Sequence, residues 1–224
     1  MPKPEVRHSS RAGTITFQSS AFLSSAFLAS TVLAAPLAAG AKCFDRSPLT
    51  PPGADPHTAI ESNQLSHSQK KAVDALFKSL RGRWQGKAKG YFCKGTRESP
   101  RQVSDNATAE IEVESYERDS VTIKAILTAD DRRSSRNELL RLFLSDETLR
   151  VGRDTRAGET KVLSARRNQL AFAIKVFHRH GGAVGGIREV HRKILVTHNQ
   201  MTIEFTVYSQ GGLISTSRWT ARRR

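Results

Sequence analysis

The feature that most constrains the fold is a hydrophobic period of two residues that runs through most of the chain after Gly82. Within 107–114, for example, apolar residues strictly alternate with threonine or glutamate. Successive side chains of a β-strand point to opposite faces, so this pattern predicts strands with one buried face. No proline follows Pro100. No residue in this part of the chain therefore has to break the hydrogen-bond ladder between strands.

The same alternation recurs in segments separated by turn-forming clusters. The first strand should follow Gly82 and end near Cys93. Further strands are expected at 107–114, 121–127, 138–144, 148–153, 161–166, 170–176, 189–196, 201–208 and 213–221. Strands joined by short turns pair antiparallel, and so many of them must close or stack to avoid long exposed edges. We expect an all-β, antiparallel up-and-down β-barrel of about 8–10 strands.

One short amphipathic helix should precede this barrel, at 66–81. Its apolar residues share one helical face, Ser66 or Ser68 can cap its start, and Gly82 suits the position just past its end. The apolar residues are Val73, Leu76, Phe77 and Leu80.

The N-terminal segment has the order of a signal peptide. A polar, net basic stretch is followed by a charge-free apolar stretch at 21–37 and by the small-x-small motif Ala39-Gly40-Ala41. We expect cleavage before Lys42, so that 1–41 is removed. An uncleaved membrane anchor is the alternative, since the apolar stretch is nearly long enough to span a bilayer. Either way the rest of the chain would face a periplasmic or extracellular compartment.

A proline-rich segment at 42–65 separates the signal peptide from the helix and the barrel domain at 66–224. Its composition predicts a flexible arm. The chain has two cysteines, Cys43 in this arm and Cys93 at the end of the first strand. In an oxidising compartment they can form one disulfide that pins the arm to the barrel, and two independent buried thiols are the alternative.

The junction of helix and first strand resembles a lipocalin motif. Gly82-Arg83-Trp84 is similar to the G-x-W that opens the first lipocalin strand, and Gly86 and Gly90 continue it as in nitrobindin-like and fatty-acid-binding-like barrels. The resemblance implies a calycin-like barrel that carries a small, mostly hydrophobic ligand. It also implies that a basic residue near the end of the barrel packs across Trp84, and Arg218 is the candidate.

Strand parity predicts which residues line the inside of this barrel, its lumen. On the first strand the face of Trp84 carries small residues, which either leave room for a ligand or let the strand bend. On a later strand Arg192 interrupts an apolar face, where it would bind a ligand carboxylate or phosphate, pair with an internal acid, or reach water at the mouth. The lumen candidates are Trp84, Gly86, Ala88, Gly90, Phe172, Ile174, His178, Arg192, Ile194 and His198.

No cofactor is expected, although four histidines in the second half make a haem or metal site conceivable. His191 and His198 fall on opposite faces, which argues against a shared site. The glycine-rich turn at 181–186 lacks a phosphate-loop ending and is interpreted as a hairpin tip that forms a lid. No nucleophile motif and no acid–base pair indicates an enzyme.

These features favour an exported, non-enzymatic barrel that binds a small hydrophobic and anionic ligand. The formal net charge of +15 supports an alternative, in which the basic exterior docks on an anionic lipid or polysaccharide surface of the envelope. Nucleic acid is not expected as a partner, because the protein is expected outside the cytoplasm and its basic residues are scattered rather than interleaved with aromatic ones.

Overall fold

A computed structural model describes residues 42–55, 58, 60–117, 119–131, 133–152, 160–180 and 183–224. The expected signal peptide at 1–41 lies outside these residues. One helix, α1 (His67–Leu80), precedes the strands. The strands are β1 Gly82–Gly95, β2 Pro100–Ser104, β3 Ala107–Glu114, β4 Ser120–Ala129, β5 Ser135–Ser145, β6 Thr148–Val151, β7 Thr160–Arg166, β8 Gln169–His180, β9 Ala183–Thr197, β10 Gln200–Ser209 and β11 Gly212–Arg223.

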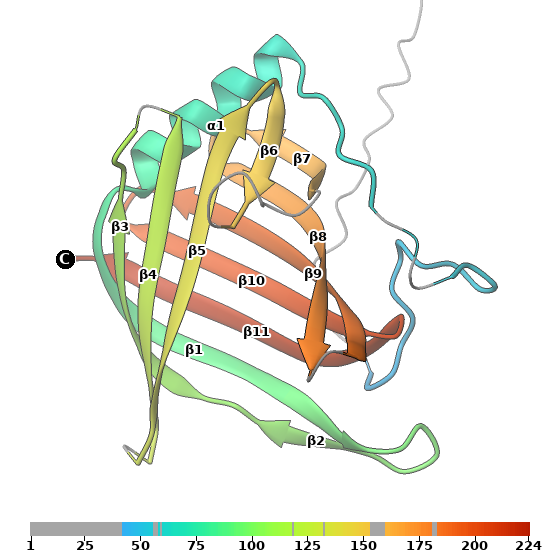
Figure 1. The fold of residues 1–224 in the computed structure, drawn as a ribbon. Coiled ribbons are helices and arrows are strands. Elements are labelled where there is room, and N and C mark those ends of the chain that lie inside the picture. The colour runs from blue at the N-terminus through green and yellow to red at the C-terminus, as the bar shows by residue number, and fades with distance from the viewer. Residues whose placement is uncertain are drawn as a thin grey trace, which may run out of the picture. The chain divides into compact units, whose positions relative to one another are not determined.

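The strands form one antiparallel sheet that curls into a nearly closed barrel (Figure 1). Their order is β6-β5-β4-β3-β1-β11-β10-β9-β8-β7, and β2 pairs with the far half of β1 outside this path. Ten strands therefore surround the barrel, which confirms the predicted fold class. The strand β2 was not predicted, and β9 begins at Ala183, inside the glycine-rich segment that was expected to be a turn.

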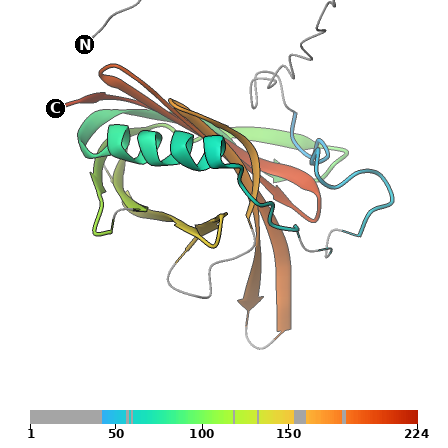
Figure 2. The same cartoon turned by 90° about the horizontal axis from the view of Figure 1, so that it is seen from above.

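Helix α1 begins and ends as local sequence rules require. Ser66 is its N-cap: the Ser66 hydroxyl accepts a hydrogen bond from the Gln69 backbone N–H, and the Gln69 side chain accepts one from the Ser66 backbone N–H. The predicted apolar residues of the helix are all buried. They join the core formed by the inward side chains of both walls of the barrel, so that α1 lies across one end of it (Figure 2). In the described part of the chain, no helix is long and apolar enough to cross a bilayer.

The beginning of the arm is attached to the barrel rather than loose. Cys43 and Cys93 form a disulfide across a sequence separation of 50 residues. The Phe44 N–H donates to the Leu213 carbonyl at 2.9 Å, and the Leu213 N–H donates to the Asp45 carbonyl at 2.8 Å. The arm thus continues hydrogen bonding at the start of β11, a contact that its proline-rich composition did not indicate.

Candidate functional site

The predicted inner face of the barrel is largely hydrophobic core. Trp84, Ala88, Phe172, Ile174 and Ile194 are buried in one cluster with the helix. The Trp84 indole N–H donates to the Leu80 carbonyl at 2.8 Å, which ties the first strand to the end of α1. These residues therefore belong to the packed core of the barrel.

Gly86 and Gly90 let two strands approach closely. A Cβ atom added at Gly86 would lie 1.9 Å from the Thr220 carbonyl oxygen, and one at Gly90 would lie 2.2 Å from the Thr216 oxygen. Only glycine fits such a close approach between β1 and β11. The backbone of β11 therefore fills the space beside both glycines.

Arg192 is a cation on the inner face of β9. Its strand neighbours are Phe172 on β8 and Phe205 on β10, and its guanidinium lies 5.4 Å from the centre of the Phe205 ring. Its Nε atom is buried and has no hydrogen-bond partner in the described part of the chain. Burial lowers the pKa of Arg192, and the negative charge of Glu138 on the opposite wall partly offsets this by raising it. An arginine remains charged at neutral pH, so this position holds an incompletely compensated positive charge among aromatic rings.

The facing wall carries its own charged residues. Glu138 lies on the inner face of β5, and one of its oxygens is 3.8 Å from the Arg136 Nε. Arg136 also binds both carboxylate oxygens of Asp105, at 2.8 and 2.7 Å. This bidentate pair raises the pKa of Arg136. Arg136 is therefore paired with the carboxylates of Asp105 and Glu138, whereas the Nε of Arg192 has no hydrogen-bond partner in the described part of the chain.

One predicted lumen histidine, His198, lies outside this interior. His198 lies in the turn between β9 and β10 with a backbone φ of 47°, and it is exposed. The strand alternation that placed it in the lumen ends one residue earlier, at Thr197. The backbone of His178 belongs to β8, but its side chain lies outside the described residues. Within the described part, no three histidine, cysteine or carboxylate side chains gather as a metal site.

Arg223, not Arg218, packs across Trp84. The Arg223 guanidinium lies 4.4 Å from the Trp84 ring centre and donates to the carbonyls of Arg81 and Ser79 at the end of α1. Arg218 points to the outer face, where its Nη2 lies 2.5 Å from a carboxylate oxygen of Glu204. A basic residue thus packs across this tryptophan, but it is Arg223 rather than Arg218.

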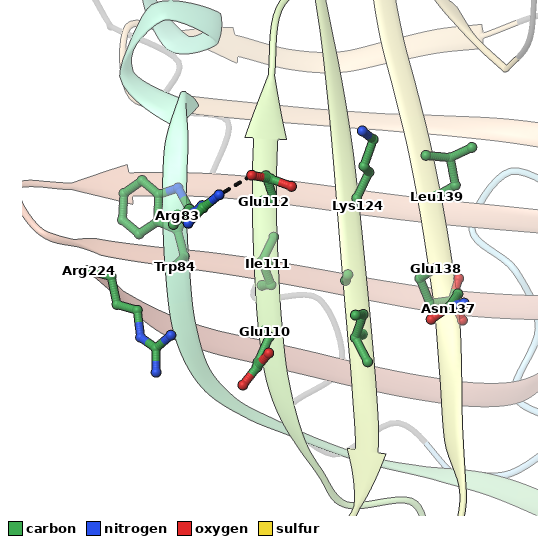
Figure 3. A pocket seen from close by; sticks show the side chains of 12 residues that line it. Arg83, Trp84, Glu110, Ile111, Glu112, Lys124, Asn137, Glu138, Leu139 and Arg224 are labelled. Carbon is green, nitrogen blue, oxygen red and sulfur yellow. Dashed lines mark hydrogen bonds and ion pairs between the residues drawn. The ribbon is translucent and has the colours of Figure 1, made fainter.

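A groove of about 690 Å³ lies on the outer face of β1, β3, β4 and β5 (Figure 3). Its rim holds ion pairs, since Arg83 binds Glu112 at 3.1 Å and Lys124 binds Glu114 at 2.6 Å. Leu139, nearly half exposed, adds an apolar patch. The lining thus carries both positive and negative side chains, so its charge indicates no single class of ligand.

A buried polar cluster lies under the arm on the outer face of β9 and β10. Glu189 accepts hydrogen bonds from Ser47 and Thr50 of the arm and is paired with His191, whose ring contacts Tyr208. Burial acts to raise the pKa of Glu189, but the bonds from His191, Ser47 and Thr50 outweigh it and hold that pKa below its usual value. Burial raises the pKa of Tyr208 to about 12.

This cluster contains a serine, a histidine and an acid, but not in a catalytic arrangement. Ser47 donates to the Glu189 carboxylate rather than to His191, and both side chains are almost completely buried. A nucleophile needs its base within hydrogen-bond reach and an open path to a substrate. The cluster instead fixes the arm to the sheet. The sequence signal that marks it is Glu189 and His191 at alternate positions of one strand face.

Comparison with known proteins gives no family. No protein-family model matches this chain, and no curated protein matches its sequence. Among solved structures, an S-type phycobiliprotein lyase from Guillardia theta is 13% identical with a TM-score of 0.47, covering 71% of this chain and 98% of the lyase. A DUF3598 protein of unknown function from Nostoc punctiforme is 14% identical with a TM-score of 0.43, covering 75% of this chain and 53% of that protein. A redesigned β-barrel bound to DFHBI is 11% identical with a TM-score of 0.35, covering 66% of this chain and 99% of the design.

Proposed function

We propose that this protein is a non-enzymatic carrier whose barrel binds a small molecule with an apolar body and one anionic group. The apolar body would lie against the inner aromatic and aliphatic side chains. The carboxylate, sulfonate or phosphate would pair with Arg192.

The observation that supports this proposal most is the state of the Arg192 guanidinium. Arg192 is only partly exposed, and its Nε is buried without a hydrogen-bond partner in the described part of the chain, a state that folded proteins rarely leave uncompensated. Phe205, partly buried beside it, offers an apolar surface to an aliphatic or aromatic ligand, and Phe172 on its other side belongs to the core. Ligand sites typically combine such apolar walls with a few convergent polar groups.

The test compares two ligands of equal chain length, dodecanoate and dodecanol. Trp219 can report binding by its fluorescence, because its ring meets Phe205 edge-on at 5.5 Å and Phe205 contacts Arg192. A charge-assisted hydrogen bond contributes about 1.5–3 kcal/mol, so Arg192→Met should weaken dodecanoate binding by about tenfold or more. Dodecanol binding should change little. Equal weakening of both ligands, or no binding of either, would refute the role of Arg192.

We also propose that the protein is exported. The signal-peptide order of 1–41 supports this, and so does the Cys43–Cys93 disulfide, since disulfides persist mainly outside the cytoplasm. Expression of the full chain in a Gram-negative host should yield a periplasmic product whose N-terminal sequence begins at Lys42. Recovery of the uncleaved chain with reduced cysteines from the cytoplasm would contradict the proposal.

A further inference from the structure

A second hollow lies outside the barrel, on the face of β1, β10 and β11, and has a volume of about 420 Å³. Two adjacent rows of outward side chains cross it. In one row, running from β1 across β11 to β10, Lys89, Arg218 and Glu204 lie side by side. In the next row the corresponding residues are Tyr91, Thr216 and Thr206. Asn106, just before β3, also lines it.

The floor of this hollow is polar and buried, which is unusual for the outer face of a sheet. Thr206 is 2% exposed, and Thr216 and Glu204 are each 9% exposed. One oxygen of Glu204 binds Arg218, but the other, Oε2, is buried and has no hydrogen-bond partner in the described part of the chain. A buried carboxylate oxygen that lacks a donor is costly, so Glu204 retains unused acceptor capacity at the floor of the hollow.

The mixed charges of the lining restrict the class of ligand. A cation would satisfy Glu204 but would meet Lys89 and Arg218, and an anion would meet Glu204. A hydroxyl group both donates and accepts, so neighbouring hydroxyls of one molecule can donate to Glu204 and accept from Arg218 or Lys89. The ring of Tyr91, whose hydroxyl is hydrogen-bonded to Thr216, offers an apolar surface for carbon-bound hydrogens.

We infer that this hollow is a binding site for a neutral saccharide. Its volume falls within the usual range of ligand sites, about 300–1,000 Å³. The site lies on the opposite side of the sheet from Arg192, so it is independent of the proposed lumen ligand.

The experiment is a calorimetric titration of the full, processed protein with three neutral disaccharides: maltose, lactose and diacetylchitobiose. Glucosamine and glucuronate serve as charged comparators. At least one disaccharide should bind at millimolar concentration and more tightly than either charged sugar. Glu204→Gln should weaken that binding about tenfold, as expected for the loss of one hydrogen bond to a charged group.

Two further variants separate binding from folding. Lys89→Met changes a residue at the rim and should weaken binding several-fold in a folded protein. Lys87→Met is the matched control, because it lies on the same face of β1 two positions away and does not line the hollow. Its affinity should equal that of the unmodified protein. Failure of all three disaccharides to bind, or equal binding by the Lys89 and Lys87 variants, overturns the inference.

Discussion

Replacing Arg192 by methionine should stabilise the protein while it removes anion binding. Replacing buried ion pairs by apolar side chains of similar volume is often neutral or adds about 1–4 kcal/mol to the free energy of unfolding, and Arg192 is a single, partly exposed cation. Arg192 keeps some compensation, from the Phe205 ring at 5.4 Å and from the charge of Glu138. We therefore expect a gain at the lower end, about 1–2 kcal/mol. Urea unfolding followed by tryptophan fluorescence would show this as a midpoint raised by about 0.5–1 M.

The matched control is Arg136→Met on the facing wall. Arg136 holds Asp105 bidentately and its side chain is 42% exposed, so its loss should lower the unfolding free energy by about 1 kcal/mol or less. The two variants should thus shift stability in opposite directions. A loss of more than about 1 kcal/mol in Arg192→Met would refute the reasoning, because it would show that the fold depends on this cation.

Further substitutions test the contacts around the barrel and the titration of Tyr208. Arg223→Ala should cost about 1–2 kcal/mol through the lost ring contact and helix-end hydrogen bonds, measured by urea unfolding, and Arg218→Ala should cost less than about 1 kcal/mol. Replacing Cys43 and Cys93 by serine should lower the unfolding free energy by up to about 4 kcal/mol, and a reductant should destabilise only the unmodified protein. The pKa of Tyr208 is raised to about 12, so the native state keeps a proton that the unfolded state loses above about pH 10. Stability should then fall between pH 10 and 12 by on the order of 2 kcal/mol more than in Tyr208→Phe, as pH-dependent urea titrations can show.

Local patterns in the sequence were sufficient for most of the barrel. Strand β3 follows strict alternation of buried and less buried residues, and the sequence of α1 contains both its apolar face and its Ser66 cap. Alternation also predicts the inward position of Arg192. By contrast, β2 is short and shows no alternating burial, so nothing local marks it as a strand.

Long-range partners were harder to predict. Ser47 of the arm binds Glu189, 142 residues away, and composition alone indicated only a flexible segment. The position of His198 was wrong because periodicity does not show where a strand yields to a turn. Strand parity favours Arg223 over Arg218: Trp219 faces inward, and the same parity places Arg223 on the face of Trp84, opposite it in the register.

Native mass spectrometry of the full, processed protein incubated with dodecanoate tests the central claim most directly. The account predicts a one-to-one adduct in the unmodified protein and in Arg136→Met, and loss of that adduct in Arg192→Met. An adduct of equal abundance in all three proteins, or in none of them, would contradict the claim that Arg192 binds an anionic ligand inside the barrel.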